Sequence, residues 1–265
     1  MSDEQSPASA SSAAKPRDTL PAPVVVQLTT LPPVPCPYLP DRAETIRAVM
    51  ASGIDPETYR AFMDAGFRRS GRMIYQPVCA GCRQCVQLRV PVNEFVPSRS
   101  QRRCWARNQD LAVSWSAPAL TDEKSALYSR YVRDWHGRPE DAEESTLRTF
   151  LYDSPTQTLE FEYRDASHRL LGVGICDLSD TSLSSVYFYF DPSEHQRGLG
   201  TFGALYELAW CRAREIGHYY LGYWVRDCRA MDYKASFSPH ELLSETGEWL
   251  PRLMRDADGP SRRSN

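Results

Sequence analysis

Arginines and cysteines crowd one stretch of the chain, FRRSGRMIYQPVCAGCRQCVQLRV, at residues 67–90. Arg68, Arg69 and Arg72 lie on a predicted hairpin that turns at Ser70-Gly71. A guanidinium group can hold a carboxylate through two parallel hydrogen bonds. Arginines on an edge strand are also typical of a surface that resists aggregation. The stretch therefore predicts either a carboxylate site or a charged edge.

Cysteines follow at C-x2-C-x2-C spacing, as Cys79, Cys82 and Cys85, and Cys36 lies upstream in the proline-rich loop CPYLP. Four thiolates form the ligand set that zinc or an iron–sulfur cluster prefers. Packed free thiols give the same pattern, so the sequence leaves both interpretations open. The remaining cysteines are predicted to be structural: Cys104, Cys176, Cys211 and Cys228.

The densest basic segment is PSRSQRRCWARNQD, residues 97–110. Ser98 is a typical helix cap, and no acidic residue interrupts the arginines that follow at helical spacing: Arg99, Arg102, Arg103 and Arg107. Such a stripe suits a phosphate backbone, where charge gives affinity without reading sequence. A solvated helix face is the alternative.

A glycine turn, His195 to Gly200, separates a strand-like run from a predicted helix over 199–216. Gly198 and Gly200 let backbone N–H groups line a concavity that binds an oxyanion at the start of the helix. HYYLGYWV then reads as another strand. Strand, turn, helix and strand form a βαβ unit, which predicts an α/β (α+β) fold with a mixed sheet.

Composition bounds the remaining possibilities. With 265 residues and 42% hydrophobic content the chain can bury a sizeable core. A net charge of −3 means that any nucleic-acid contact must come from a local patch. We expect no membrane span, no secretory signal and a cytoplasmic location with reduced thiols. The predicted organisation is a disordered tail at 1–33, a cysteine/arginine-rich region at 34–115, a second domain with the mixed sheet at 116–250 and a tail at 251–265.

Two resemblances enter at these motifs. The glycine turn after a strand resembles the N-acetyltransferase-like (GNAT) fold, although His195 stands where that family usually has Gln or Arg. The whole chain more closely resembles tRNA-dependent aminoacyl-protein transferases of the arginyl/leucyltransferase type, and its length resembles the bacterial aspartate/glutamate leucyltransferase branch. The motifs occur in the family's order from Cys36 to Leu243: CPYLP, GFRRSG, the cysteine run, PSRSQRR, SSVYFYFDP, LGT, YLGYW and MDYKASFSP.

The resemblance implies transfer of leucine from leucyl-tRNA to the α-amine of proteins with N-terminal Asp or Glu, marking them for degradation. The aminoacyl ester is already activated, so no cofactor is required, and zinc or an iron–sulfur cluster at the cysteines stays open. Arg99 to Arg107 are expected to bind the tRNA. The expected substrate-binding residues are Arg68, Arg69, Arg72, Tyr75, Asp177, Tyr187, Tyr189, Tyr223 and Trp224.

Gly198 and Gly200 are expected to stabilise the oxyanion, with His195 a candidate base and Lys234 a candidate for proton transfer or phosphate contact. Three other functions compete. An arginyl donor would use the same acceptors, a CoA-dependent N-acetyltransferase would bind acetyl-CoA without tRNA, and a non-enzymatic metal- or nucleic-acid-binding module would form no product.

Overall fold

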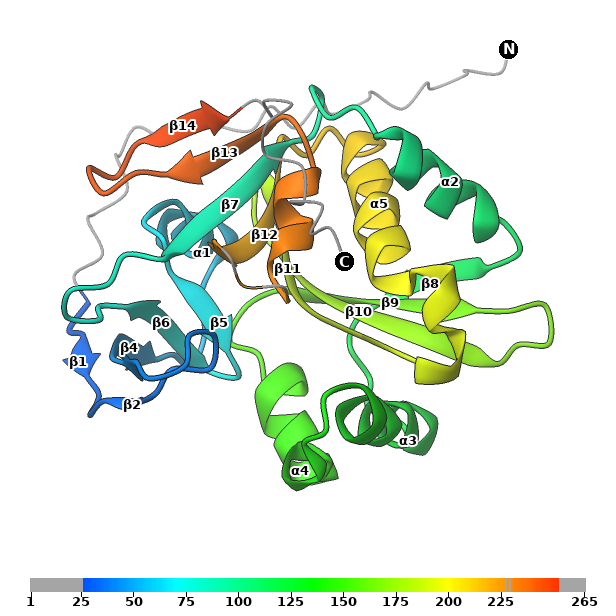
Figure 1. Ribbon diagram of the computed structural model, residues 1–265, viewed down its shortest axis with the longest axis horizontal. Helices are drawn as coiled ribbons and strands as arrows, with labels where there is room; N and C mark the ends of the chain where they lie inside the picture. Colours follow the sequence, from blue (N-terminus) through cyan, green and yellow to red (C-terminus); the bar gives the residue numbers. More distant parts are fainter. Residues whose placement is uncertain (1–25, 227, 229, 253–265) are drawn as a thin grey trace, which may run out of the picture.

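An eight-stranded mixed sheet forms the centre of the molecule (Figure 1). The computed structural model describes residues 26–226, 228 and 230–252. The strands follow the spatial order β14-β13-β7-β12-β11-β10-β9-β8. Their bounds are β7 Cys85–Pro91, β8 Ala112–Ser116, β9 Thr158–Arg164, β10 Leu170–Leu178, β11 Ser182–Phe190, β12 His218–Val225, β13 His240–Leu243 and β14 Trp249–Arg252.

Neighbouring strands are antiparallel except β11 and β12, which are parallel. The helix α5, Leu199–Arg212, connects that parallel pair, as a βαβ crossover requires. The predicted fold class, a mixed α/β sheet with this βαβ unit, is confirmed.

Helices cover both faces of the sheet (Figure 1). On one face α5 packs beside α2, Arg99–Arg107, which begins at a capping box formed by Ser98 and Gln101. On the other face lie α3, Asp122–Arg130, and α4, Glu144–Leu147. Each of these two helices continues as a π-helical turn, η1 Tyr131–Trp135 and η3 Arg148–Tyr152. Short 3-10 turns complete the set: η2 Pro139–Asp141, η4 Pro192–Arg197 and η5 Asp232–Ser236.

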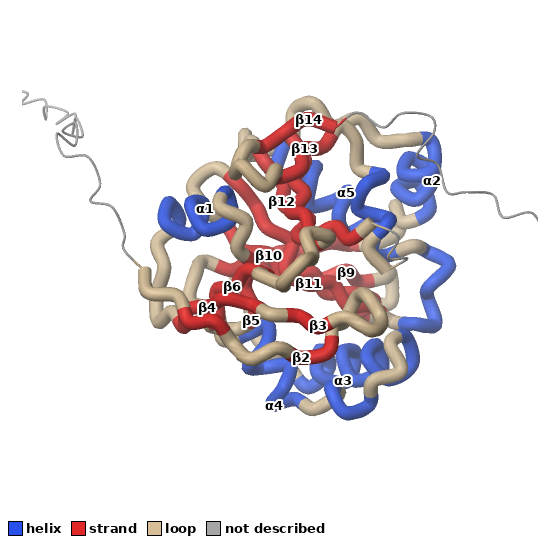
Figure 2. Tube along the Cα trace, turned by 60° about the vertical axis from the view of Figure 1, so that its left-hand side comes forward, coloured by secondary structure: helices blue, strands red, loops and turns tan. Residues whose placement is uncertain are grey.

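A smaller lobe precedes β7 in the chain. It holds the sheet β1-β4-β6-β5, the pair β2-β3 and the helix α1, and it lies beside the large sheet (Figure 2). The bounds are β1 Thr29–Thr30, β2 Val34–Pro35, β3 Ala43–Glu44, β4 Ile46–Met50, α1 Pro56–Asp64, β5 Arg68–Ser70 and β6 Met73–Pro77. Tyr59, Phe67 and Ile74 from this lobe pack on Tyr220 of β12, so a shared apolar cluster joins it to the sheet.

The predicted division of the chain does not follow the sheet. β7 and all but the last residue of β8 lie within 34–115, yet both are strands of the eight-stranded sheet, because β7 pairs with β12 and β8 with β9. The tail prediction is wrong at Thr29–Thr30, which pairs with β4, and at 251–252, where β14 pairs with β13. The rest of the predicted tails, at 1–25 and 253–265, lies outside the described residues.

Candidate functional site

The parallel strands β11 and β12 separate into a fork. They pair only from Ser182 to Ser184 on β11 and from His218 to Tyr220 on β12. Just beyond, each strand bulges against its other neighbour: Val186 has no partner on β10, and Leu221 none on β7. A bulge bends a strand and increases its twist, so the two bulges direct the strands apart. The backbone edge of Ser185–Phe190 therefore does not pair with β12.

Arg68 fills the base of this fork. Its Nη1 atom donates to Ser184 Oγ at 2.7 Å, and its Nη2 atom donates to the carbonyl of Ser185. On the β12 side its guanidinium lies against Gly222, where an added Cβ would be 3.0 Å from three of its atoms. Gly222 also has a φ of +80°, which favours glycine. The small lobe thus inserts one arginine between two strands of the large sheet.

Lys234 is a second buried cation beside the fork. It lies in η5, and its Nζ atom donates to the carbonyl of Tyr223 on β12 at 2.8 Å. Burial, together with the positive charge of Arg68, lowers the pKa of Lys234 from 10.5 to about 7. With a pKa of about 7, the Lys234 side chain is a neutral amine in a large fraction of molecules at neutral pH, as a proton acceptor requires.

Both cations lack an acidic partner within the described part of the chain. Arg68 and Lys234 are each only 8% exposed, and neither forms an ion pair with any described carboxylate. A buried charge without a counterion costs several kcal/mol, roughly, so such a pair is typical of a site that receives an anion. Tyr75, half-buried, lies close enough that the charge of Arg68 acts on its hydroxyl.

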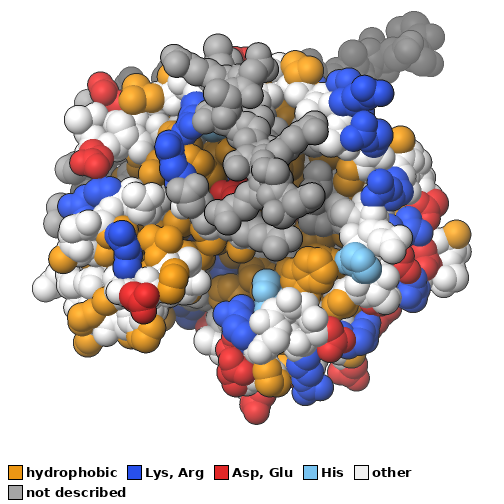
Figure 3. Space-filling view, viewed as in Figure 1, with side chains coloured by type: hydrophobic (Ala, Val, Ile, Leu, Met, Phe, Trp, Pro, Cys, Tyr) orange, Lys and Arg blue, Asp and Glu red, His pale blue; other side chains and the backbone are white. Residues whose placement is uncertain are grey.

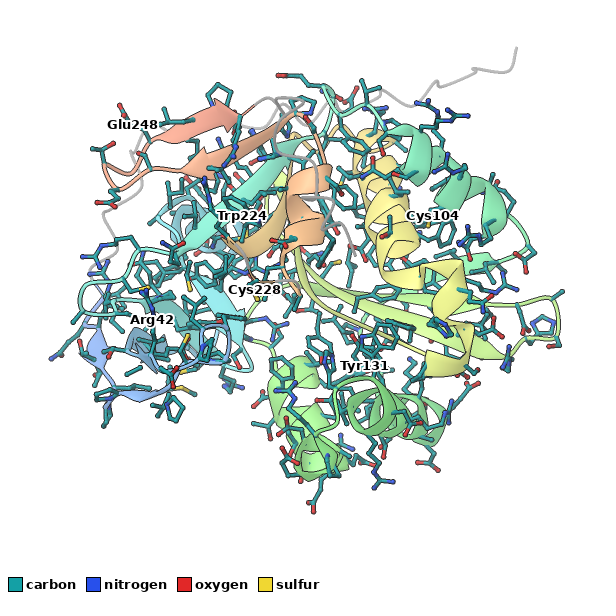
Figure 4. All side chains as sticks on the ribbon, in the orientation of Figure 1. Arg42, Cys104, Tyr131, Trp224, Cys228 and Glu248 are labelled. Carbon is teal, nitrogen blue, oxygen red and sulfur yellow. The ribbon has the colours of Figure 1, made fainter. Side chains whose placement is uncertain are left out.

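Aromatic side chains form a wall on the far arm of the fork. Tyr187, on the separated half of β11, contacts Phe150 at a ring distance of 5.2 Å and Tyr131 at 6.3 Å. The surface is hollowed between the small lobe and the helical lobe of α3 and α4, and hydrophobic side chains gather there (Figure 3). Tyr131 lies where that helical lobe faces the centre of the molecule, and Cys228 lies across from it (Figure 4).

Arg69 and Asp177 do not face a substrate, contrary to their predicted roles. Both side chains are fully buried, and they bind each other through Arg69 Nε and Asp177 Oδ2 at 2.6 Å and through Arg69 Nη2 and Asp177 Oδ1 at 3.0 Å. Tyr59 and Thr158 donate to the same carboxylate, each at 2.7 Å. Asp177 has no lone pair left for an amine, so the pair joins the small lobe to the sheet instead.

The third predicted arginine, Arg72, also lies apart from Arg68. It binds Asp153 at 3.0 Å in an exposed pair and donates to the backbone carbonyls of Ala51 and Ser52. Successive strand residues point to opposite faces, and the hairpin turn separates Arg72 from both others. The predicted three-arginine pocket is therefore wrong, and Arg68 alone occupies the fork.

Three aromatic residues that were predicted to bind the substrate are instead buried in the protein. Tyr189 is fully buried, with its hydroxyl 3.0 Å from that of Tyr152, so it does not line an aminoacyl pocket. Tyr223 and Trp224 were both predicted to bind the substrate, but adjacent strand residues face opposite sides of the sheet. Tyr223 is 6% exposed and donates to the Gly66 carbonyl at 2.8 Å, while Trp224 is 8% exposed with Arg226 over its ring at 5.6 Å.

The glycine turn lies at the start of α5. Gly198 has a φ of +70° and ends η4, while Cys104 of α2 and Asn108, which caps the end of α2, donate to the backbone carbonyls of this turn. His195 is exposed, and its ring lies 6.4 Å from Trp135. Among the described residues no hydrogen bond or ion pair joins the turn to Arg68 or Lys234. The oxyanion role of Gly198 and Gly200 and the basic role of His195 stay predictions.

The arginine stripe of α2 is present as predicted. Arg99, Arg102, Arg103 and Arg107 are all exposed, because Gln101 and Cys104 form the buried face of the helix. Across the described residues none of the four is ion-paired; Arg102 and Arg107 donate only to the carbonyls of Pro97 and Gln196. The stripe is therefore free to meet an external polyanion.

The four candidate metal ligands gather around Cys85. Burial, with the charges of Cys79, Cys36 and Cys82, raises the pKa of the Cys85 thiol to about 12. Yet within residues 26–226, 228 and 230–252 no three Cys, His, Asp or Glu side chains are arranged to hold a metal ion. The backbone N–H of Thr45 instead donates to Cys79 Sγ at 3.3 Å. As arranged, the thiols do not fit a metal or cluster, and such binding stays a prediction.

Several residues of the fork were not found from the sequence. Ser184 and Ser185 hold Arg68, Gly222 provides its space, and Tyr38 lies near it. Tyr38 and Gly222 do lie inside quoted motifs, CPYLP and YLGYW, which was the available signal. The two serines likewise begin the quoted motif SSVYFYFDP, but the bulge beside them has no sequence signature, so their role at Arg68 was not predicted.

Comparisons with known proteins identify the family. The sequence profile described as "Arginine-tRNA-protein transferase, N terminus" matches residues 34–103, and its C-terminal counterpart matches residues 123–244. The chain belongs to the arginine-tRNA-protein transferase family. Its members are aminoacyltransferases that act with a tRNA and a protein, and the family's two regions contribute Arg68 and Lys234 to one fork.

Among the relatives, a protein of Saccharophagus degradans named "Aspartate/glutamate leucyltransferase" is 36% identical over 228 residues, 85% of this chain and 96% of the relative. Proteins of the same name from Hahella chejuensis and Stenotrophomonas maltophilia are 38% and 42% identical, over 80% and 78% of this chain and 92% and 86% of theirs. Of solved structures, FemX is similar at a TM-score of 0.46 and 9% identity, covering 78% of this chain and 71% of that one. That value is too low to carry an argument.

Proposed function

We propose that this protein transfers leucine from leucyl-tRNA to the α-amino group of proteins that begin with Asp or Glu. The relatives that share most of its length bear the name of that activity. The observation that carries the proposal is the fork, where Arg68 and Lys234 are buried without a described carboxylate partner. An acceptor's acidic side chain is the missing anion, and arginine can bind it through two hydrogen bonds.

Lys234 is suited to move the proton of the reaction. The acceptor arrives as an ammonium ion and must become a free amine before it can attack the ester carbonyl. Neutral Lys234 takes that proton, a C–N bond forms, and the ester C–O bond to the tRNA ribose breaks. The resulting lysine ammonium gives this proton to the departing ribose oxygen. The second proton, which the nitrogen loses as it becomes an amide, passes to the regenerated lysine amine or to water. Unpaired backbone groups on the separated half of β11 are available to stabilise the oxyanion.

The donor is expected to contact two surfaces. The exposed arginines of α2 offer charge to the phosphate backbone of the tRNA. The wall of Tyr187, Tyr131 and Phe150 offers an apolar surface to the aminoacyl side chain, which favours leucine over arginine because a guanidinium would need an acidic partner. An arginyl donor with the same acceptors is the second candidate, since the family description names it.

No ATP, CoA or metal enters these steps, because the ester is already activated. The reaction lengthens an acidic N-terminus by one residue, which suits a role in marking proteins for degradation. We propose a cytoplasmic location, where charged tRNA is found. No helix in the described residues is long and apolar enough to cross a membrane.

The test is a transfer assay with isolated components. Leucyl-tRNA or arginyl-tRNA is incubated with the protein and with peptides that differ only in their first residue, Asp, Glu, Lys or Ala. We expect leucine on the α-amine of the Asp and Glu peptides alone. Arginine in its place would select the second candidate. No transfer from either tRNA, with acetylation from acetyl-CoA instead, would overturn the proposal.

A further inference from the structure

A cavity of about 370 Å³ lies between α2 and α5, away from the fork. Its floor is apolar and buried, with Val92, Phe95, Leu205 and Leu208 each at most 6% exposed. Trp105 of α2 adds an aromatic wall, held by Phe202 at a ring distance of 5.4 Å. The volume and apolar lining are in the range of sites that take a small ligand or part of one.

The rim of the cavity is cationic. Arg102 and Arg212 line it, and both bind backbone carbonyls: Arg102 that of Pro97 at 2.7 Å, and Arg212 those of Val92 and Phe95 at 2.7 and 2.8 Å. These bonds hold the arginines in place without neutralising them, since neither is ion-paired to a described carboxylate. Arg102 also belongs to the exposed stripe of α2, so the cavity opens beside that stripe.

We propose that this cavity takes one unpaired nucleobase of the donor tRNA, while Arg102 and Arg212 contact the phosphates on either side. The inference rests on the proposed function, in which a tRNA is a substrate. An aromatic-lined apolar pocket next to a cationic track is how proteins hold single-stranded nucleic acid, because every base has an apolar face and every linkage a charge. The charge of the rim favours a nucleic acid over an apolar protein segment as the occupant.

The mouth of the cavity offers a variant that should fold. Ala209 is exposed and lines the cavity, so Ala209→Trp fills it from the solvent side, and Ala209→Ser is the matched control. Loss of one base contact should weaken leucyl-tRNA binding about tenfold in Ala209→Trp and leave it unchanged in Ala209→Ser. The dependence of affinity on salt should keep its slope, because the phosphate contacts remain. Arg103→Gln, by contrast, should reduce that slope.

The nucleobase that enters the cavity is identified by combining changes in the tRNA with the Ala209→Trp change in the protein. Leucyl-tRNAs with one abasic nucleotide at each unpaired position of the acceptor end are titrated against the wild-type and Ala209→Trp proteins. At one position the abasic change should weaken binding by the wild type about tenfold and have no effect on Ala209→Trp. Additive losses at every position would overturn the inference, as would unchanged tRNA affinity in Ala209→Trp. A loss confined to the KM of the acceptor peptide would assign the cavity to the protein substrate instead. If the cavity inference fails in this way but the wild-type protein still transfers leucine to the Asp and Glu peptides, the proposed function is unaffected.

Discussion

Lys234 and Lys124 are both buried lysines, but their surroundings predict opposite effects on stability. Lys124 is 3% exposed and bound to two carboxylates, Glu160 and Glu162, the latter at 2.9 Å. Lys234 is 8% exposed, next to Arg68, and its Nζ atom is bound only to a carbonyl oxygen. Lys234→Met and Lys124→Met each replace a buried lysine by an uncharged side chain of similar length. The first removes a charge that destabilises the fold, and the second leaves two carboxylates without their partner.

The magnitude follows from the pKa of Lys234. The difference between its ordinary value of 10.5 and about 7 corresponds to a cost of about 5 kcal/mol for keeping the charge buried. Replacing the lysine also leaves the Tyr223 carbonyl without its donor, at about 1–3 kcal/mol. Lys234→Met should therefore raise the unfolding free energy at pH 6 by on the order of 2 kcal/mol. Lys124→Met should lower it by about 3–5 kcal/mol.

The lowered pKa of Lys234 also predicts how the unfolding free energy of the wild type changes with pH. Between pH 7 and 10.5 the unfolded chain binds a proton at Lys234 that the folded protein has released, so this group makes wild-type stability rise with pH in that window. Below pH 7 its cost is present in full. Denaturant melts of both variants and the wild type at pH 6 and pH 9 measure this. Equal destabilisation by the two variants, or a Lys234→Met effect that does not change with pH, would show that the buried Lys234 charge does not destabilise the fold. Transfer should still be lost in Lys234→Met.

Three further predictions test neighbouring features. Asp177→Ala leaves Arg69 buried and unpaired, so it should lower the unfolding free energy in a denaturant melt by about 3–5 kcal/mol. The control Asp180→Ala breaks an exposed pair with Arg60 and should lower it by less than about 1 kcal/mol. Similar losses in both variants would show that Asp177 is not a structural link. Gly222→Ala should reduce the rate of transfer at least about tenfold, because the new Cβ meets Arg68. The control Gly247→Ala, also at a positive φ but with open space around it, should leave the rate unchanged. Equal transfer rates in the two variants would place Arg68 elsewhere. Cys85 should react with iodoacetamide at pH 8 more slowly than a free cysteine because its pKa is raised to about 12, as peptide mass spectrometry can measure; protection of all four thiols by added zinc would establish the predicted metal site.

Local patterns predicted much of the fold. Ser98 marked the start of α2, because capping chemistry acts between residues three or four apart, and Asp55 caps α1 at Pro56 in the same way. The hairpin of β5 and β6 turned at the predicted glycine, with Gly71 at a φ of +58°. The strand before the glycine turn, the helix that follows it and the strand HYYLGYWV were also predicted, and they are β11, α5 and β12.

The site was harder to predict because it depends on pairing between distant segments. Three arginines within five residues looked like one pocket, yet strand alternation and a turn send Arg68, Arg69 and Arg72 to three places. The sequence contained both Arg69 and Asp177 but could not show that they bind each other across 108 residues. Lys234 was named as a candidate, and only the structure shows its burial beside Arg68.

In the proposed reaction Arg68 binds the carboxylate of the acceptor in the fork between β11 and β12. The direct measurement is the ratio of kcat/KM for leucine transfer to two peptides of equal shape, one starting with Asp and one with Asn. It is made with the wild type, Arg68→Gln and the control Arg72→Gln, each checked for folding by circular dichroism. We predict a strong preference for Asp in the wild type and in Arg72→Gln, and a ratio near one in Arg68→Gln. A preference that survives in folded Arg68→Gln, or disappears in Arg72→Gln, would contradict the claim.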